Sequence, residues 1–270
     1  MLHLMTTLPL KLVPMEGDGG YKAPGVEDFQ FHGNWGHEWL TKPTLQAILA
    51  ALVVIGFWLW ASHGLKVRPT KKQVVMERIY EFVRNGIARD TLGHDYRKFL
   101  PYLLALFSFI LINNWYGQMF FTMFPTFSNI GYAYGLALVT WLVYVGAGIA
   151  KHGLGGYLKH SLMPEGVPWW IMPLIIPLEF LSNFITRPLT LSMRLFANMF
   201  AGHLVIMLFV VGGAFLATYP DNLFFNVSGA LSLVFSFALF ALELFVGALQ
   251  AYVFTVLTAQ YVSSSIADEH

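Results

Sequence analysis

Two titratable or charged side chains interrupt a stretch of the chain that is otherwise apolar enough to cross a membrane. Residues 188–208 have the sequence PLTLSMRLFANMFAGHLVIML, which contains Arg194 and, nine residues later, His203. An arginine in the middle of a membrane helix costs at least ~2.5–3.5 kcal/mol on insertion scales, and ionisable residues at such depth usually serve a function. Arg194 is therefore the first candidate for chemistry.

A second apolar stretch, residues 223–262, contains Glu243 as its single charged residue and Gln250 seven positions later. In an antiparallel helical hairpin, the residue numbers of two residues at the same height add up to a constant value. The sums for the pairs Arg194–Gln250 and His203–Glu243 differ by only two, so both pairs fit one register. At 1.5 Å per residue the two pairs are separated by ~13.5 Å on one helix and ~10.5 Å on the other. Nine residues turn His203 about 180° from Arg194, so we expect the two to face different environments.

Proton transfer is the chemistry that these residue types suit. Histidine titrates near pH 6.5, and an isolated carboxyl in a membrane helix must be neutralised, paired with a group such as His203, or exposed to water. Taken singly, His203 and Gln250 are more simply explained as hydrogen-bonded packing residues. A structural role for Arg194, paired with an acid, is the less favoured interpretation, because Glu179 lies fifteen residues away and Glu243 lies at another height on the neighbouring helix. The shared register with Glu243 favours a functional group. Asn113 and Asn114, in another apolar stretch, are expected to form interhelical hydrogen bonds.

Composition identifies a polytopic membrane protein. Of 270 residues, 56% are hydrophobic and 11% are charged, whereas soluble domains have about 25% charged residues. Residues 99–150 include no Asp, Glu, Lys or Arg. The net charge of +1 and the scattered histidines indicate no nucleic-acid partner, metal site or cofactor, and the absence of cysteine excludes disulfides.

We therefore predict an all-α fold with about five transmembrane helices and an amphipathic surface helix at about residues 73–92. The expected spans are about 44–62, 99–121, 131–150, 170–219 and 223–262. The last two far exceed the ~20 residues of an upright span, so we expect a hairpin of long, tilted helices with possible breaks at Pro173, Pro177 and Pro188. A re-entrant hairpin at residues 169–186 is the alternative.

Charge distribution predicts the orientation. Residues 63–98 contain nine Lys and Arg against four Asp and Glu, which places this loop in the cytoplasm by the positive-inside rule. The amphipathic helix within it either lies on the membrane or packs on the protein itself. We expect residues 1–43 to be an extracytoplasmic arm, residues 44–270 a single membrane domain, and the C-terminus cytoplasmic.

Two sequence segments, RPLTLSMRLFANMFAGHL and ELFVGALQAYVFTVLTAQYV, resemble the signature of the subunit a family of F-type ATP synthases, and actinobacterial members most. The resemblance assigns proton-translocating roles to six residues: Arg194, Asn198, His203, Glu243, Gln250 and Asn114. Arg194 matches the essential arginine, Gln250 the glutamine acting with it, and His203 and Glu243 line the outer access channel. An acid that some relatives carry near Asn114 is replaced by Gly117.

The resemblance further implies a non-catalytic stator subunit of the Fo sector in the bacterial plasma membrane. Its two proton half-channels would lie against the rotating ring of c subunits, whose carboxylate would face Arg194. The remaining partners would be the subunit b peripheral stalk, the rest of the ATP synthase and the lipid bilayer, with no cofactor. A stand-alone proton-coupled secondary transporter is the main alternative, although the chain has no internal repeat of the kind such proteins often contain. A structural assembly subunit without an ion path is the other.

Overall fold

The structure is a computed structural model. It describes residues 23–25, 41–64, 66, 68–119, 125–163, 168–219 and 223–267, so nearly all of the arm predicted for residues 1–43 lies outside the described residues. The described part of the chain contains helices and no strand, and five helical segments are long and apolar enough to cross a membrane. The predicted all-α polytopic fold with about five transmembrane helices is confirmed.

The helices follow one another with short connections. The α-helices are α1 (Lys42–Ser62), α2 (Lys71–Val83), α3 (Asp90–Leu92), α4 (Tyr96–Gln118), α5 (Ile130–Leu162), α6 (Met172–Phe180), α7 (Arg187–Ala217) and α8 (Leu223–Ser265). The π-helical segments are η3 (Arg84–Arg89) and η6 (Leu181–Thr186), and the 3-10 segments are η4 (Gly93–Asp95) and η5 (Thr126–Ser128).

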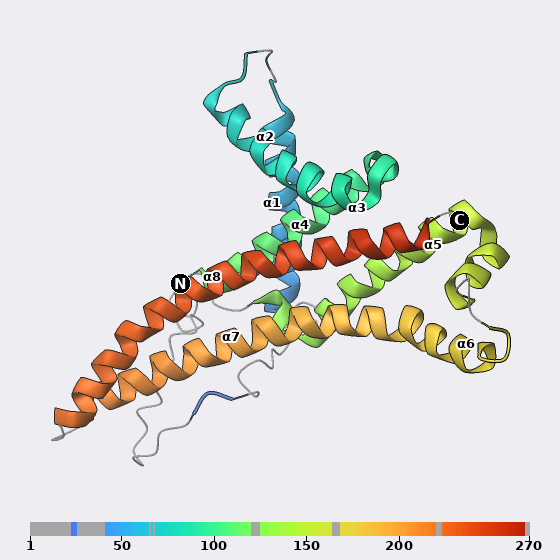
Figure 1. Ribbon diagram of the computed structural model, residues 1–270. Helices are drawn as coiled ribbons and strands as arrows, with labels where there is room; N and C mark the ends of the chain where they lie inside the picture. Colours follow the sequence, from blue (N-terminus) through green and yellow to red (C-terminus); the bar gives the residue numbers. More distant parts are fainter. Residues whose placement is uncertain are drawn as a thin grey trace.

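The last two helices form a long antiparallel hairpin that crosses α1 and α4 steeply (Figure 1). With 43 residues, α8 is about 65 Å long, roughly twice the ~30 Å hydrocarbon core, so it fits a membrane only when strongly tilted or extended beyond it. Glycines bring the two backbones together near the tip: a Cβ on Gly213 would lie 3.1 Å from the Cβ of Ser232, and one on Gly229 would collide with the backbone of Ala217. The hairpin is present as predicted.

Between Met172 and Ala217 the helical path is continuous and includes the π-helical segment η6. Pro188 in the first turn of α7 explains this local change, because proline donates no N–H and its ring crowds the carbonyl four residues earlier. The break expected at Pro188 is thus a π-helical segment. The chain does not reverse within residues 172–186, as a re-entrant hairpin would require.

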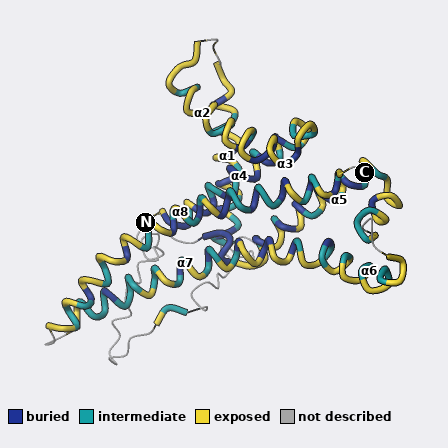
Figure 2. The backbone as a smooth tube through the Cα atoms, in the orientation of Figure 1, coloured by how far each residue is buried: buried dark blue, intermediate teal, exposed yellow. Residues whose placement is uncertain are grey.

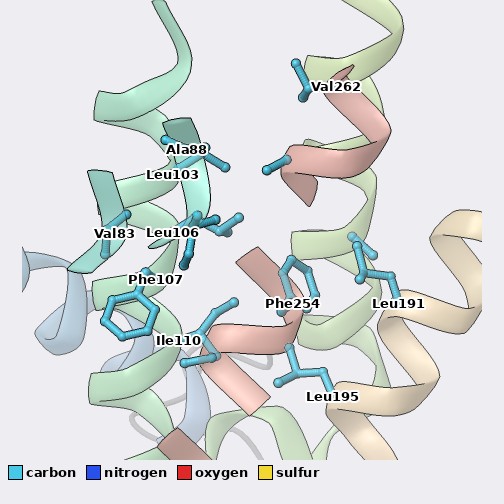
Figure 3. Packing of buried hydrophobic residues seen from close by; sticks show 14 of the residues in the cluster. Val83, Ala88, Leu103, Leu106, Phe107, Ile110, Leu191, Leu195, Phe254 and Val262 are labelled. Atoms are coloured by element: carbon cyan, nitrogen blue, oxygen red, sulfur yellow. The ribbon is translucent and has the colours of Figure 1, made fainter. Parts of the chain in front are cut away.

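The apolar core lies where α4, α7 and α8 meet the segment around η3. Figure 3 shows Val83, Leu103 and Ile110 on one side and Leu195 and Phe254 on the other, and all five are fully buried. Figure 2 shows that burial is concentrated in this central region, whereas the outer end of the α7–α8 hairpin is largely exposed. The core therefore fixes the middle of the hairpin, where the candidate residues lie.

The amphipathic segment predicted at about 73–92 is helical from Lys71 to Leu92, with η3 in its middle. Its second half packs on the protein: Val83, Ile87 and Ala88 are fully buried. Its first half leaves the apolar side chains of Val74 and Val75 exposed. The second half therefore packs on the protein itself, and contact of the first half with the membrane surface stays a prediction.

Candidate functional site

The register of the α7–α8 hairpin is fixed by the contact between Gly202 and Glu243. A Cβ added to Gly202 would collide with both carboxylate oxygens of Glu243, so the acid occupies the space that this glycine leaves. Glu243 is 7% exposed, and its Oε1 has no hydrogen-bond partner. The sequence predicts that Glu243 lies at the height of His203. Its contact with Gly202, one residue earlier, agrees with that register.

His203 is buried next to this contact but turns toward α4. Its Nε2 lies 2.7 Å from the carbonyl oxygen of Gly117, and its Nδ1 is buried without a partner. Because a carbonyl only accepts, Nε2 carries the proton in this geometry, which leaves Nδ1 of the neutral ring as a free acceptor. Within the described ranges no hydrogen bond or ion pair joins His203 to Glu243. The two share a level and border the same region, without direct contact.

Arg194 lies in a different environment. It is exposed, while Leu191 and Leu195 on an adjoining side of α7 are buried. In the part of the chain that the structure describes, no ion pair engages its guanidinium. Counting seven residues away from the Gly202–Glu243 contact on both helices brings Leu195 opposite Gln250. Arg194 is the neighbour of Leu195, so Gln250 lies at nearly the same height as Arg194. The expected difference in environment between the exposed Arg194 and the buried His203 is confirmed.

Amides from α4 complete the buried polar region. The Nδ2 of Asn114 donates to the carbonyl oxygen of Gly247 at 2.9 Å, which is the interhelical hydrogen bond expected of it. Asn113 instead donates to Phe109 in its own helix, at 2.8 Å. Asn114 also keeps a buried Oδ1 without a partner, so packing leaves the acceptor side of its amide unused.

Several polar atoms in this region are buried without a protein partner. In α4 these are Asn113 Oδ1, Asn114 Oδ1 and Gln118 Nε2, in α7 Asn198 Nδ2 and His203 Nδ1, and in α8 Glu243 Oε1 and Gln250 Nε2. Most buried polar side-chain atoms in proteins have a partner, protein or ordered water. The unpaired donors and acceptors of α4, α7 and α8 could therefore be satisfied by water.

Gly117 cannot carry the acid that the resemblance associates with its position. A Cβ here would lie 2.8 Å from the Cβ and 2.9 Å from the Cα of Pro125, closer than packed atoms come. The close approach of Pro125 explains the glycine. The carboxylate on this side of the site is instead supplied by Glu243.

Sequence reasoning missed a second polar cluster at the other end of α7. Asn183 Nδ2 donates to the carbonyl oxygen of Ser161 at 2.8 Å and to Oε2 of Glu179 at 3.2 Å, and the Tyr144 hydroxyl donates to the Asn183 carbonyl at 2.8 Å. A cavity of about 120 Å³ opens beside them, and Arg187 also lines it. The spacing of Glu179, Asn183 and Arg187, four residues apart on a helix, was the available signal.

The two polar clusters lie on opposite sides of Arg194 along α7. Asn183 precedes it by eleven residues and His203 follows it by nine, or about 16 Å and about 13 Å along a helix. Between them, Leu191, Leu195 and Met199 are at most 2% exposed. Ser192 is also buried there, and its hydroxyl donates to the carbonyl oxygen of Leu189 in the same helix. The buried side of this helix is therefore mainly apolar between the two polar clusters.

Comparison with known proteins identifies the family of this chain. The family model described as ATP synthase A chain matches residues 44–263. Proteins named ATP synthase subunit a are similar over most of their length: one from Nocardioides sp. is 46% identical, covering 94% of this chain and 96% of the relative. One from Paenarthrobacter aurescens is 40% identical, covering 96% and 98%, and one from Frankia alni is 40% identical, covering 95% and 90%. With five helices able to cross a membrane and a match over residues 44–263, the chain is a multi-pass membrane protein that belongs to the ATP synthase A chain family.

Proposed function

We propose that this chain conducts protons through two polar half-channels that are separated by Arg194. As a member of its family, it is the proton-translocating stator subunit of Fo in an F-type ATP synthase, and it is non-catalytic. The observation that carries the proposal is the position of the exposed Arg194 between the two polar clusters of α7.

The first half-channel is formed by Asn114, His203, Glu243 and Asn198. Glu243 and His203 border the same buried region, and each keeps one unpaired polar atom. Water bridging Glu243 Oε1 and His203 Nδ1 would connect a carboxyl to an imidazole, two groups that exchange protons. We assign the pair to the outer access channel, in accord with the predicted orientation.

The second half-channel is the cavity beside Glu179 and Asn183. Its polar lining includes His160 and Ser264, so α5, α6, α8 and η6 all contribute to it. Glu179 is its acid and faces the amide of Asn183 at 3.2 Å. We assign this cavity to the cytoplasmic exit.

Arg194 would act as the barrier between the two paths. Arginine stays protonated at accessible pH, so it repels a passing proton and cannot relay one. Since no acid of the described chain pairs with it, we propose that its counter-charge is the carboxylate of a c subunit in the rotating ring. Ala197 and Ala201 share the exposed face of α7 with Arg194, and such small side chains permit close approach of another helix. Gln250, level with Arg194, would help to orient it.

The remaining assignments concern topology and partners. The basic segment 63–98 supports a cytoplasmic location for α2, an extracytoplasmic N-terminus and a cytoplasmic C-terminus in the bacterial plasma membrane. Residues 1–43 would form an arm outside the membrane domain of residues 44–270. We also propose contact with the subunit b peripheral stalk.

Proton pumping in membrane vesicles carrying Arg194→Ala tests this function. We expect the complex to assemble, because Arg194 is exposed and unpaired within the described chain, and ATP-driven acidification to fall to background. Met193→Ala, at the neighbouring exposed position, is the matched control and should pump normally. Assembled Arg194→Ala complexes that pump at the wild-type rate would refute the proposal.

A further inference from the structure

A basic cavity lies away from both polar clusters, where the surface helix meets the start of α4. Its volume is about 620 Å³, and it is lined by Arg84, Arg89, Gly93, His94, Tyr96 and Arg97. The lining contains three arginines and no acid. It is built by η3, which carries Arg84 and Arg89, and by the turn at Gly93, whose φ of 56° favours glycine.

Two of the guanidinium groups converge on one neutral oxygen. Arg84 Nη2 and Arg97 Nε each donate to the hydroxyl of Tyr96 at 3.3 Å. Asp95, close in sequence, is paired with Lys98 at 3.0 Å. Glu81 is the acid that acts on Arg84, and it does so only through weaker electrostatic attraction. The cavity therefore concentrates positive charge, and each guanidinium retains N–H donors in the planar geometry that suits a phosphate.

An apolar groove continues from this cavity along α4. A second cavity of about 510 Å³ shares Arg84, Tyr96 and Arg97 with the first and extends over Leu100, Pro101 and Leu104. Leu100 is at the beginning of the predicted membrane span. On the same surface segment, Val75 and Phe82 of α2 are exposed and add apolar side chains. Charge followed by apolar surface matches an amphiphile with an anionic head.

We propose that this site binds an anionic phospholipid, with the phosphate of its headgroup between Arg84 and Arg97 and an acyl chain along Leu100 and Leu104. Basic pockets beside membrane helices are suited to anionic headgroups. The site is separate from the proton path, so an experiment can refute this proposal without refuting the proposed function. It would anchor the surface helix to the lipid leaflet on its side of the membrane.

Photolabelling of the complete synthase complex in lipid vesicles tests this proposal. The vesicles contain a trace of diazirine-bearing phosphatidylglycerol or, in parallel, diazirine-bearing phosphatidylcholine, and labelled peptides covering residues 80–104 are quantified. A hydrogen bond from a guanidinium to a phosphate contributes about tenfold or more in affinity, so the double variant R84Q/R97Q should lower phosphatidylglycerol labelling by about 100-fold. Arg78→Gln removes one positive charge from an exposed position of α2 outside the cavity, and it should leave the labelling within about twofold of wild type.

Several outcomes would overturn the proposal. Equal labelling by both lipids would show that charge is not recognised, and equal loss in Arg78→Gln would indicate general attraction to the surface. Displacement of the lipid by millimolar glycerol 3-phosphate would identify a site for soluble phosphoesters. Absence of labelling by either lipid would mean that another subunit covers the cavity. If R84Q/R97Q does not assemble, Arg89→Gln, whose side chain is exposed, should still lower labelling by about fivefold, and unchanged labelling there would contradict the site.

Discussion

Alanine at position 202 would place a methyl group where the carboxylate of Glu243 now lies. The colliding atoms are the end of a flexible side chain, so the carboxylate is expected to turn away while the two helices remain packed. Overpacking of this kind costs ~1–3 kcal/mol. If Glu243 carries protons at its present position, returning the carboxylate there beside the methyl group costs this ~1–3 kcal/mol. Since ~1.4 kcal/mol corresponds to a tenfold change in rate, Gly202→Ala should then lower proton flux by about 5- to 150-fold.

ATP-driven acidification of inverted membrane vesicles measures this flux, with the amount of assembled complex determined in the same membranes. Gly213→Ala is the matched control. Its Cβ would lie 3.0 Å from Ser232 Oγ and 3.2 Å from the carbonyl oxygen of Gly229, so it crowds the same helix interface without touching Glu243. We expect Gly213→Ala to retain most of the flux. Wild-type flux in Gly202→Ala, or equal losses in both variants, would refute a role for the carboxylate position.

Three further predictions concern packing and topology. Gly117→Ala should lower the yield of assembled complex, because its methyl group would meet Pro125 backbone and side-chain atoms at 2.8–2.9 Å and cost ~1–3 kcal/mol; normal yield and thermal stability would contradict this packing. Asn114→Leu removes an interhelical hydrogen bond of about 0.6 kcal/mol together with a polar atom of the outer path, so proton flux should fall clearly more than thermal stability, and unchanged flux would exclude it from the path. Cysteines placed at the exposed Tyr219 and Ser62 should react with an impermeant thiol reagent from the outside and from the cytoplasm respectively, and the reverse pattern would invert the proposed orientation.

The heights of the buried polar residues could be predicted from sequence because, in an antiparallel hairpin, the residue numbers of two residues at the same height add up to a constant value. The Gly202–Glu243 contact lies within that register. Side-chain direction was less accessible: His203 turns to Gly117 on α4, which contributes a backbone carbonyl that leaves no pattern in the sequence. Pairing with His203 was one of three alternatives for Glu243, and in the described chain the His203 ring contacts α4 instead.

The second polar cluster shows a different limit. Glu179 and Asn183 are four residues apart on one helix face, but their partners Ser161 and Tyr144 belong to α5. Nothing in the local pattern indicates that α5 returns to this place. Similarly, the π-helical segment η6 follows from the effect of Pro188 on its preceding turn, whereas η3 forms without a proline and has no such sequence marker.

The barrier role of Arg194 is tested most directly by the rate at which an imposed proton gradient decays in sealed vesicles without nucleotide, where the fully assembled synthase cannot turn over. Arg194→Gln keeps a long polar side chain and removes the permanent charge. If Arg194 separates the two half-channels, the gradient should decay faster in Arg194→Gln than in wild type, and ATP-driven pumping should be lost. Vesicles that hold the gradient as well as wild type while pumping normally would contradict the account.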